Sequence, residues 1–86
     1  MYSTRFARRV VVTQHAALRM TERGISEREL LEVIDTGDTR YSDTVRLWAF
    51  KYFPTRHDNL ICAVLVLEDA VVVKTVMHRF ELKESP

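Results

Sequence analysis

Residues 60–80, LICAVLVLEDAVVVKTVMHRF, contain two apolar segments that are separated by only three residues. The first segment, 60–67, is apolar on both faces of an extended chain, as expected for a strand at the centre of a sheet. The linker 68–70 is too short for a crossover connection, so it predicts a hairpin that leads into a last strand over 71–80. The stretch therefore predicts a sheet in which the last two strands are antiparallel neighbours.

Two helices are predicted upstream of this hairpin. Thr13 is placed to cap a helix over residues 14–23, which Gly24 ends. Ser26 begins the capping-box pattern S-x-x-E of a second helix over residues 27–36. The apolar residues of the second helix recur on one side, so this helix can pack against the sheet.

The remaining segments are expected to add strands to the sheet. Apolar or alternating residues predict strands over 6–12 and 45–53, and a short strand or a turn over 38–43. We therefore expect an α+β fold with the order β-α-α-β-β-β, in which two helices pack on a three- to five-stranded antiparallel sheet. The length of 86 residues fits a single domain, with a core over 6–80 and a frayed tail over 81–86.

The composition predicts a soluble globular protein of the cytoplasm. Hydrophobic residues make up 47% and charged residues 29% of the chain, which excludes a disordered protein. Cys62 is the single cysteine, so no disulfide can form within the chain, and a reducing compartment is expected. The N-terminus has no signal-peptide stretch, and the longest apolar run, eight residues, is far below a membrane span. A monomer or a homodimer without membrane contact is expected.

Positive charge is concentrated near the N-terminus, although the formal net charge is only +1. Residues 1–25 hold five arginines against one glutamate, a balance of +4, whereas residues 26–37 have a balance of −3. Ten of the 13 basic residues are arginine, whose guanidinium suits bidentate contact with phosphate and stacking on bases. This asymmetry favours a polyanion such as RNA, or an acidic protein, as the partner.

The predicted helix over residues 14–23 presents a charged stripe. Four side chains share an arc of about 100° opposite the apolar residues, namely His15, Arg19, Glu22 and Arg23. His15 lies in the first turn, where free backbone N–H groups and the helix dipole attract an anion. Arg19 adds positive charge and favours the neutral imidazole, the form that acts as a general base. The alternative is an ordinary solvated face, in which Glu22 pairs with His15 or relieves the repulsion between the arginines.

A second polar cluster lies at the end of the last predicted strand, which is otherwise apolar. His78 belongs to this cluster, and His15 and His78 could together serve as the base and the acid of a metal-free phosphodiester cleavage. In that scheme the ribose 2′-OH attacks the adjacent phosphorus while one histidine removes its proton. The other histidine protonates the leaving 5′-oxygen, and arginines such as Arg19 hold the charge that builds on the phosphate.

No metal or other cofactor is predicted. The candidate ligands lack a spacing such as C-x-x-C or H-x-x-x-H; these residues are His15, His57, Cys62 and His78. With only two glycines, the chain has no glycine-rich loop that could bind phosphate.

The strand predicted over 45–53 has an aromatic stripe. Alternation places Trp48, Phe50 and Tyr52 on one face together with Arg46. Aromatic rings at this spacing can stack unpaired bases. A stripe of this kind is more typical of a core that a helix covers, and we favour that interpretation.

Residues 15–26, HAALRMTERGIS, resemble the H-A-x-x-R-M-x-x-R-G-I-S signature of a bacterial domain family of unknown function. Members typically end with a strand like V-V-T-V-x-H-R, which is similar to residues 72–79, with Lys74 as an insertion-like departure. The likeness spans residues 12–80. This family is grouped with RelE- and ParE-like toxins in the barnase–EndoU–colicin–RelE class of small ribonucleases.

The resemblance implies two helices followed by an antiparallel sheet, with RNA as the substrate. It also implies a cleft where RNA is cut, lined by His15, Arg19, Arg23, Thr75, His78 and Arg79. We therefore expect catalysis by His15, His78 and Arg19. The expected substrate contacts are Arg8, Arg23, Thr75 and Arg79.

Three functions remain open on this sequence. The first is a metal-independent endoribonuclease of the RelE-like toxin type, with an antitoxin protein as its partner. The second is a non-catalytic module that uses the same basic face to bind RNA or an acidic protein. The third is a small structural protein in which the histidine and the arginines of the first helix only pack.

Overall fold

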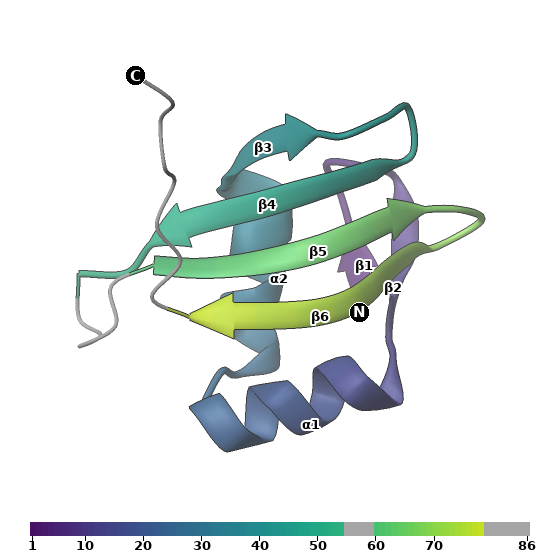
Figure 1. Ribbon diagram of the computed structural model, residues 1–86. Coiled ribbons are helices and arrows are strands. Elements are labelled where there is room, and N and C mark those ends of the chain that lie inside the picture. Colours follow the sequence, from purple (N-terminus) through teal and green to yellow (C-terminus); the bar gives the residue numbers. More distant parts are fainter. Residues whose placement is uncertain (55–59, 79–86) are drawn as a thin grey trace.

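The computed structural model of the protein describes residues 1–54 and 60–78 (Figure 1). Its helices and strands are, in chain order, β1 (Tyr2–Ser3), β2 (Arg8–Val12), α1 (Gln14–Arg23), α2 (Glu27–Thr36), β3 (Asp38–Tyr41), β4 (Arg46–Tyr52), β5 (Leu60–Leu67) and β6 (Val71–His78). The fold is α+β, and both predicted helices and the predicted antiparallel hairpin are confirmed. The tail predicted over 81–86 lies outside the described residues.

Capping residues set the boundaries of the two helices. At the start of α1, the Thr13 hydroxyl accepts a hydrogen bond of 3.1 Å from the backbone N–H of Ala16. Gly24 ends α1 in the left-handed conformation, with φ 62° and ψ 39°. Ser26 and Glu29 make both hydrogen bonds of a capping box at the start of α2. Among the described residues, no helix has the length and apolar character needed to cross a membrane.

Within the described part of the chain, the strands form one six-stranded sheet in the order β1-β2-β6-β5-β4-β3. Neighbouring strands are antiparallel except β2 and β6, which run parallel and pair from Val10–Val71 to Val12–Val73. The expected three- to five-stranded antiparallel sheet of RelE-like type is therefore wrong, because the sheet is mixed and has six strands.

Two properties of the chain explain this difference. An apolar run identifies a strand but does not determine how it pairs with a distant strand, and β2 shares only three residue pairs with β6. β1 has two residues, too few for an alternating pattern. It is held by tertiary contacts instead, since the Asp35 carboxylate accepts hydrogen bonds from the hydroxyls of Ser3 (2.6 Å) and Thr4 (3.2 Å).

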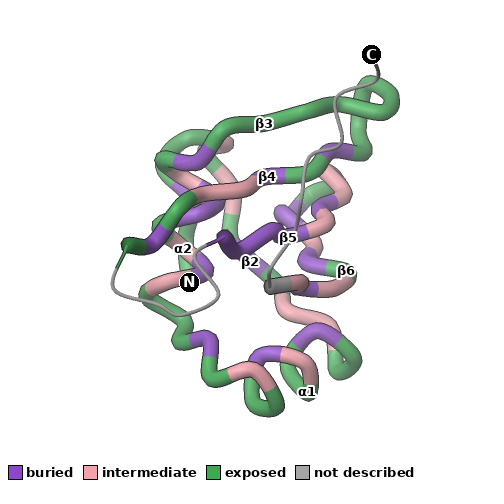
Figure 2. Tube along the Cα trace, turned by 60° about the vertical axis from the view of Figure 1, so that its left-hand side comes forward, coloured by how far each residue is buried: buried purple, intermediate pink, exposed green. Residues whose placement is uncertain are grey.

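The core lies between the sheet and the two helices. α2 packs behind β4 and β5, and α1 packs along β6 (Figure 1). The strand residues on this side are buried, and they include Leu47, Ala49, Ile61, Ala63, Leu65, Val73 and Val76. β3 forms one edge of the sheet and is exposed along its length (Figure 2).

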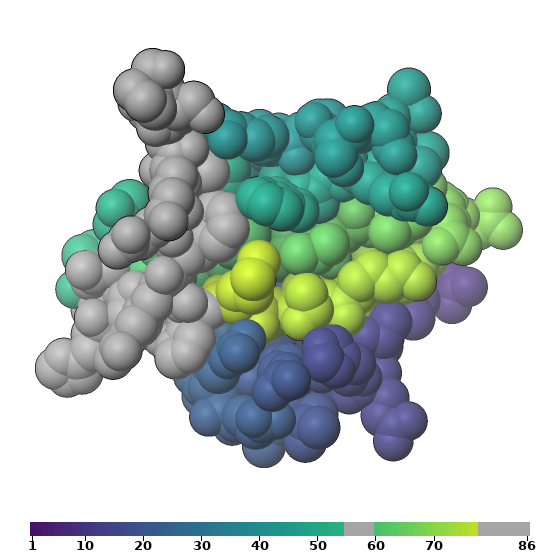
Figure 3. Space-filling model, in the orientation of Figure 1, coloured from purple at the N-terminus to yellow at the C-terminus, as the bar shows by residue number. Residues whose placement is uncertain are grey.

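The other side of the sheet, here called the open face, is not covered by either helix (Figure 3). The open face comprises Asp38 and Arg40 of β3, Arg46, Trp48, Phe50 and Tyr52 of β4, Leu60, Cys62, Val64 and Val66 of β5, and Val72, Thr75 and Met77 of β6. Trp48 keeps 37% and Tyr52 69% of its surface exposed. The interpretation of the aromatic stripe as a core under a helix is therefore wrong.

Candidate functional site

α1 takes the place of a strand beside the second half of β6. β2 pairs with β6 as far as Val73, and the chain then turns into α1, which runs along β6 (Figure 1). At the start of α1, the backbone N–H and the hydroxyl of Thr13 donate hydrogen bonds to the carbonyls of Val73 and Lys74, both at 3.2 Å. At its end, Arg23 donates a hydrogen bond to the carbonyl of Val76. The helix is thus attached to the strand at both ends.

A β-bulge in β6 determines which face Thr75 occupies. The register of β6 on β5 skips Lys74, and Thr75 pairs with Val64. Because the bulge resets the alternation of side chains, Thr75 lies on the open face while Val76 is buried on the helix side. The insertion-like Lys74 of the sequence pattern is therefore the bulged residue.

His15 and Thr75 meet where α1 begins beside β6. The Thr75 hydroxyl lies 3.2 Å from Nε2 of His15, although the two residues are 60 positions apart in the chain. A hydrogen bond to one ring nitrogen orients the imidazole and selects its tautomer. His15 is exposed and Thr75 is half-buried, so the ring is accessible from solvent. The structure therefore brings one predicted residue of the helix together with one of the last strand.

Arg19 lies one turn after His15 on the same stripe of α1. Its guanidinium is 3.3 Å from the Glu22 carboxylate, and the two side chains are 38% and 46% exposed. This ion pair agrees with the alternative given in the sequence analysis, in which Glu22 relieves the repulsion between the arginines of the helix. An ion pair this exposed contributes only about 0–1 kcal/mol, so a phosphate can displace Glu22 from Arg19 at little cost.

Arg8, a predicted substrate contact, lies away from this place. β2 and β6 are parallel, and Val10 pairs with Val71. Arg8 is therefore offset from Thr75 by five steps of the sheet register, which skips Lys74, a distance of roughly 17 Å. The structure does not bring Arg8 together with the other predicted residues.

Three further residues of the sequence analysis lie wholly or partly outside the described residues. The backbone of His78 pairs with Ile61 at the end of β6, but its side chain is not described. Arg79 and His57 are outside the described ranges altogether. His78, a predicted catalytic residue, is therefore located only by the position of its backbone on the strand.

A row of side chains crosses the open face from β3 to α1. Arg40 pairs with Trp48, Trp48 pairs with Val64, and Val64 pairs with Thr75. Paired residues of antiparallel strands point to the same face, and Thr75 continues the row to His15. Arg40 was not among the predicted site residues, and Trp48 was assigned to the core.

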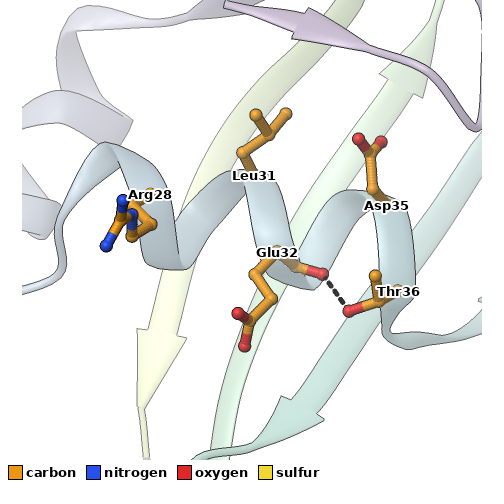
Figure 4. A pocket seen from close by; sticks show the side chains of 5 residues that line it. All are labelled: Arg28, Leu31, Glu32, Asp35 and Thr36. Carbon is orange, nitrogen blue, oxygen red and sulfur yellow. Dashed lines mark hydrogen bonds between the residues drawn. The ribbon is translucent and has the colours of Figure 1, made fainter.

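α2 has a hollow of about 530 Å³ on its outer surface (Figure 4). Its two carboxylates have partners within the protein, since Asp35 binds the N-terminal segment and Glu32 lies 3.5 Å from Lys51. Figure 4 shows the side chains of Asp35 and Glu32 on different sides of the helix, so they do not converge on one point. The hollow therefore has the character of an ordinary groove beside a helix.

Cys62 does not provide a nucleophile. It is buried, and burial raises the pKa of its thiol to about 12, so the thiol stays protonated at neutral pH. Among the side chains that the structure describes, in residues 1–54 and 60–77, no three of His, Cys, Asp or Glu are grouped as metal ligands would be.

Comparison with known proteins identifies a family for this chain. No curated protein and no solved structure matches it. The sequence model of a family described as a domain of unknown function matches residues 12–78, from the end of β2 to the end of β6. This range contains His15, Arg19, Arg23 and Thr75, and it does not include Arg8. Because the match covers most of its length, the chain belongs to the DUF4258 family, a family of domains of unknown function.

Proposed function

We propose that the protein is a metal-independent endoribonuclease whose reaction takes place where α1 meets β6. The observation that carries this proposal is the 3.2 Å contact between His15 and Thr75, which holds an exposed imidazole one turn from Arg19. An imidazole that a second side chain orients has the arrangement of a general base. A neighbouring guanidinium suits the phosphate of RNA.

In the proposed reaction, Nε2–H of His15 donates a hydrogen bond to the Thr75 hydroxyl, which leaves the lone pair of Nδ1 for the substrate. Nδ1 accepts the proton of the ribose 2′-OH while the 2′-oxygen forms a bond to the adjacent phosphorus. The bond from phosphorus to the 5′-oxygen breaks, and His78 donates the proton that this oxygen takes up. The products are a 2′,3′-cyclic phosphate and a 5′-hydroxyl.

The arginines have different roles in this proposal. Arg19 binds the phosphate as its negative charge increases in the transition state, and Glu22 gives way to the substrate. Arg23 mainly positions α1, because its hydrogen bond to the carbonyl of Val76 attaches this helix to β6. Arg79 remains a substrate contact in the proposal, and Arg8 does not.

The family that the sequence resembles is grouped with RelE- and ParE-like toxins, and this grouping supports RNA as the substrate class and adds an antitoxin protein to the proposal as a partner. If the proposal holds, induced expression of the wild type slows bacterial growth. The His15→Ala variant, expressed at the same level, does not.

The direct test is cleavage of a labelled single-stranded RNA, measured with and without EDTA. Because histidine acid–base catalysis contributes about 10²–10⁴-fold, His15→Ala is expected to lose most cleavage while it keeps its affinity for RNA. Arg19→Ala is expected to lose both, because it removes a phosphate contact as well. Gln14→Ala and Arg28→Ala, at exposed helix positions outside the stripe, are the matched controls, and circular dichroism confirms the fold of each variant.

The same assay separates the alternatives. Cleavage that EDTA abolishes would overturn the metal-independent mechanism. RNA binding that weakens with salt, without cleavage, would favour a non-catalytic binding module, which the row of arginine and aromatic side chains on the open face also supports. The absence of both cleavage and RNA binding would point to an acidic protein as the partner of the arginines.

A further inference from the structure

We infer that Trp48 is the platform on which an unpaired base of the substrate stacks. The inference rests on the proposed function and adds the class of substrate, an RNA single strand whose phosphate lies at His15 and Arg19. The indole offers a large flat surface, and 37% of Trp48 is exposed on the open face. Stacking on an aromatic ring needs no particular base, so this contact selects unpaired strands rather than a sequence.

The sheet register fixes the distance between the platform and the phosphate site. Trp48 in β4 and Thr75 in β6 both pair with Val64, so they lie in one row across the open face. Neighbouring strands are about 4.8 Å apart, which places Trp48 roughly 10 Å from Thr75. His15 adjoins Thr75 at the end of this row. A short segment of one RNA strand can therefore reach from the ring to the imidazole.

Positive charge lies at both ends of the row. Arg40 pairs with Trp48 from the edge strand β3 and is exposed. Arg19 stands at the other end, next to His15 on α1. Cations that follow the backbone, with an aromatic ring between them for the bases, are the arrangement that single-strand binders use.

The charge further along the open face also suits a single RNA strand. Arg46 precedes Trp48 by two positions on the same face, and its side chain is 70% exposed. Its contact with Asp43 is long, 3.8 Å, and exposed, so it opposes phosphate binding only weakly. Asp38 is an acidic residue of this face, and it lies beside Phe50 in the adjacent row. An acidic peptide would satisfy these arginines, but it would leave the indole unused.

The experiment exploits the fact that Trp48 is the single tryptophan of the chain, so its fluorescence reports on this position alone. The probe is a short 2′-O-methylated oligouridine, which cannot undergo attack by a 2′-OH. Titration with this probe is expected to quench the fluorescence of Trp48 as a base stacks on the ring. Duplex RNA is expected to quench it much less, because its bases are already stacked and paired.

Variants then test the contribution of the ring to affinity. Trp48→Leu keeps an apolar side chain but removes the ring, and its affinity for the labelled oligouridine is expected to fall about 5- to 150-fold. Trp48→Phe retains a ring and is expected to retain most of the affinity. The matched control is Tyr41→Leu, because Tyr41 is 50% exposed in β3 but pairs with Leu47, which places it on the opposite face. This control is expected to leave the affinity unchanged.

The outcomes distinguish this inference from the proposed function. Quenching by the single strand without cleavage of natural RNA would support the base platform and overturn the catalytic proposal alone. Cleavage without quenching, with unchanged affinity in Trp48→Leu, would overturn the platform and leave the ribonuclease. Quenching by polyglutamate as strong as that by the oligouridine would overturn the platform in favour of an acidic protein partner.

Discussion

Thr75 Oγ1 lies 3.2 Å from Nε2 of His15, so a residue late in the last strand orients a residue in the first turn of α1. The contact depends on the bulge at Lys74, which turns Thr75 to the open face beside the helix. It also depends on Thr13, which caps α1 and donates hydrogen bonds to Val73 and Lys74. The position of the imidazole is therefore a property of the tertiary fold.

Replacement of Thr75 tests this relationship through the rate of catalysis. Thr75→Val keeps the shape of the side chain but removes the hydroxyl, so the orientation of His15 is lost. We expect kcat for RNA cleavage to fall by about tenfold or more, within the range of general acid–base catalysis, while KM changes little. Thr75→Ser restores the hydroxyl and is expected to restore kcat. Equal activity of the valine and serine variants would show that Thr75 only packs in the strand.

The parts of the fold that follow from short-range signals could be predicted from the sequence. α1 begins after a capping threonine and ends at a glycine, and α2 begins with a capping box. The hairpin follows from a linker of three residues between two apolar strands. Each of these signals acts over a few neighbouring residues, so the pattern and the physical cause occupy the same stretch of sequence.

The long-range parts could not be predicted in this way. The parallel pairing of β2 with β6 depends on three residue pairs between strands at opposite ends of the chain. α2 packs on one face of β4, and no helix covers the other face, so Trp48 is exposed where a covered core was expected. The sequence did contain one indication that this face is exposed. Arg46 alternates onto the same face as Trp48, and a guanidinium is rarely found in a core without a partner.

Gly37 is expected to be the less replaceable of the two glycines. A Cβ at Gly37 would lie 2.5 Å from the carbonyl oxygen of Val33 and 2.6 Å from that of Phe50, so helix and strand would have to separate. We expect Gly37→Ala to lower the free energy of unfolding by about 3 kcal/mol, at the upper end for overpacking. Gly24→Ala meets no atom within 4 Å and loses only about 1–2 kcal/mol, through its left-handed conformation. Urea denaturation of both variants measures the difference, and equal losses would contradict the close approach of α2 to β4.

Asp43 is expected to stabilise the turn between β3 and β4 in a pH-dependent way. Its carboxylate accepts hydrogen bonds from the backbone N–H groups of Val45 (2.9 Å) and Arg46 (2.8 Å). The hydrogen bond from Val45 is the largest cause that holds the pKa of Asp43 below its ordinary value of 3.8. The hydrogen bond from Arg46 and the positive charge of Arg46 lower the pKa further. Because the pKa is lower in the folded state, the stabilisation is present above pH 3.8 and is lost as the pH falls through the lowered pKa.

The comparison of Asp43→Asn with the wild type isolates this charge. Urea midpoints at neutral pH are expected to be lower for the variant, and the difference is expected to close as the pH falls below 3.8. Asp69→Asn, at an exposed position in the hairpin between β5 and β6, is the control for a general change in net charge. A difference between Asp43→Asn and the wild type that persists unchanged at acidic pH would contradict the assignment.

The N-terminal segment is held to the end of α2 by the carboxylate of Asp35 and the guanidinium of Arg5. Asp35 accepts hydrogen bonds from the buried Ser3 hydroxyl (2.6 Å) and from the Thr4 hydroxyl (3.2 Å). Arg5 adds hydrogen bonds to the carbonyls of Ile34 (3.1 Å) and Gly37 (2.7 Å). β1 therefore depends on contacts with α2 as well as on its two residue pairs with β2.

Asp35→Ala is expected to release β1 and leave the rest of the sheet intact. It leaves the Ser3 hydroxyl without its acceptor in a buried site, so the free energy of unfolding should fall by about 1–3 kcal/mol. Hydrogen exchange should accelerate at the amide of Val10, which donates to the carbonyl of Met1, more than at amides between β4 and β5.

In a double-mutant cycle, Ser3→Ala should have little further effect in the Asp35→Ala background, because the two side chains share one interaction. Glu32→Ala, which removes an exposed carboxylate from the same helix, is the control and should leave exchange at Val10 unchanged. Additive effects of Ser3→Ala and Asp35→Ala, or uniform acceleration across the sheet, would contradict an independent attachment of β1.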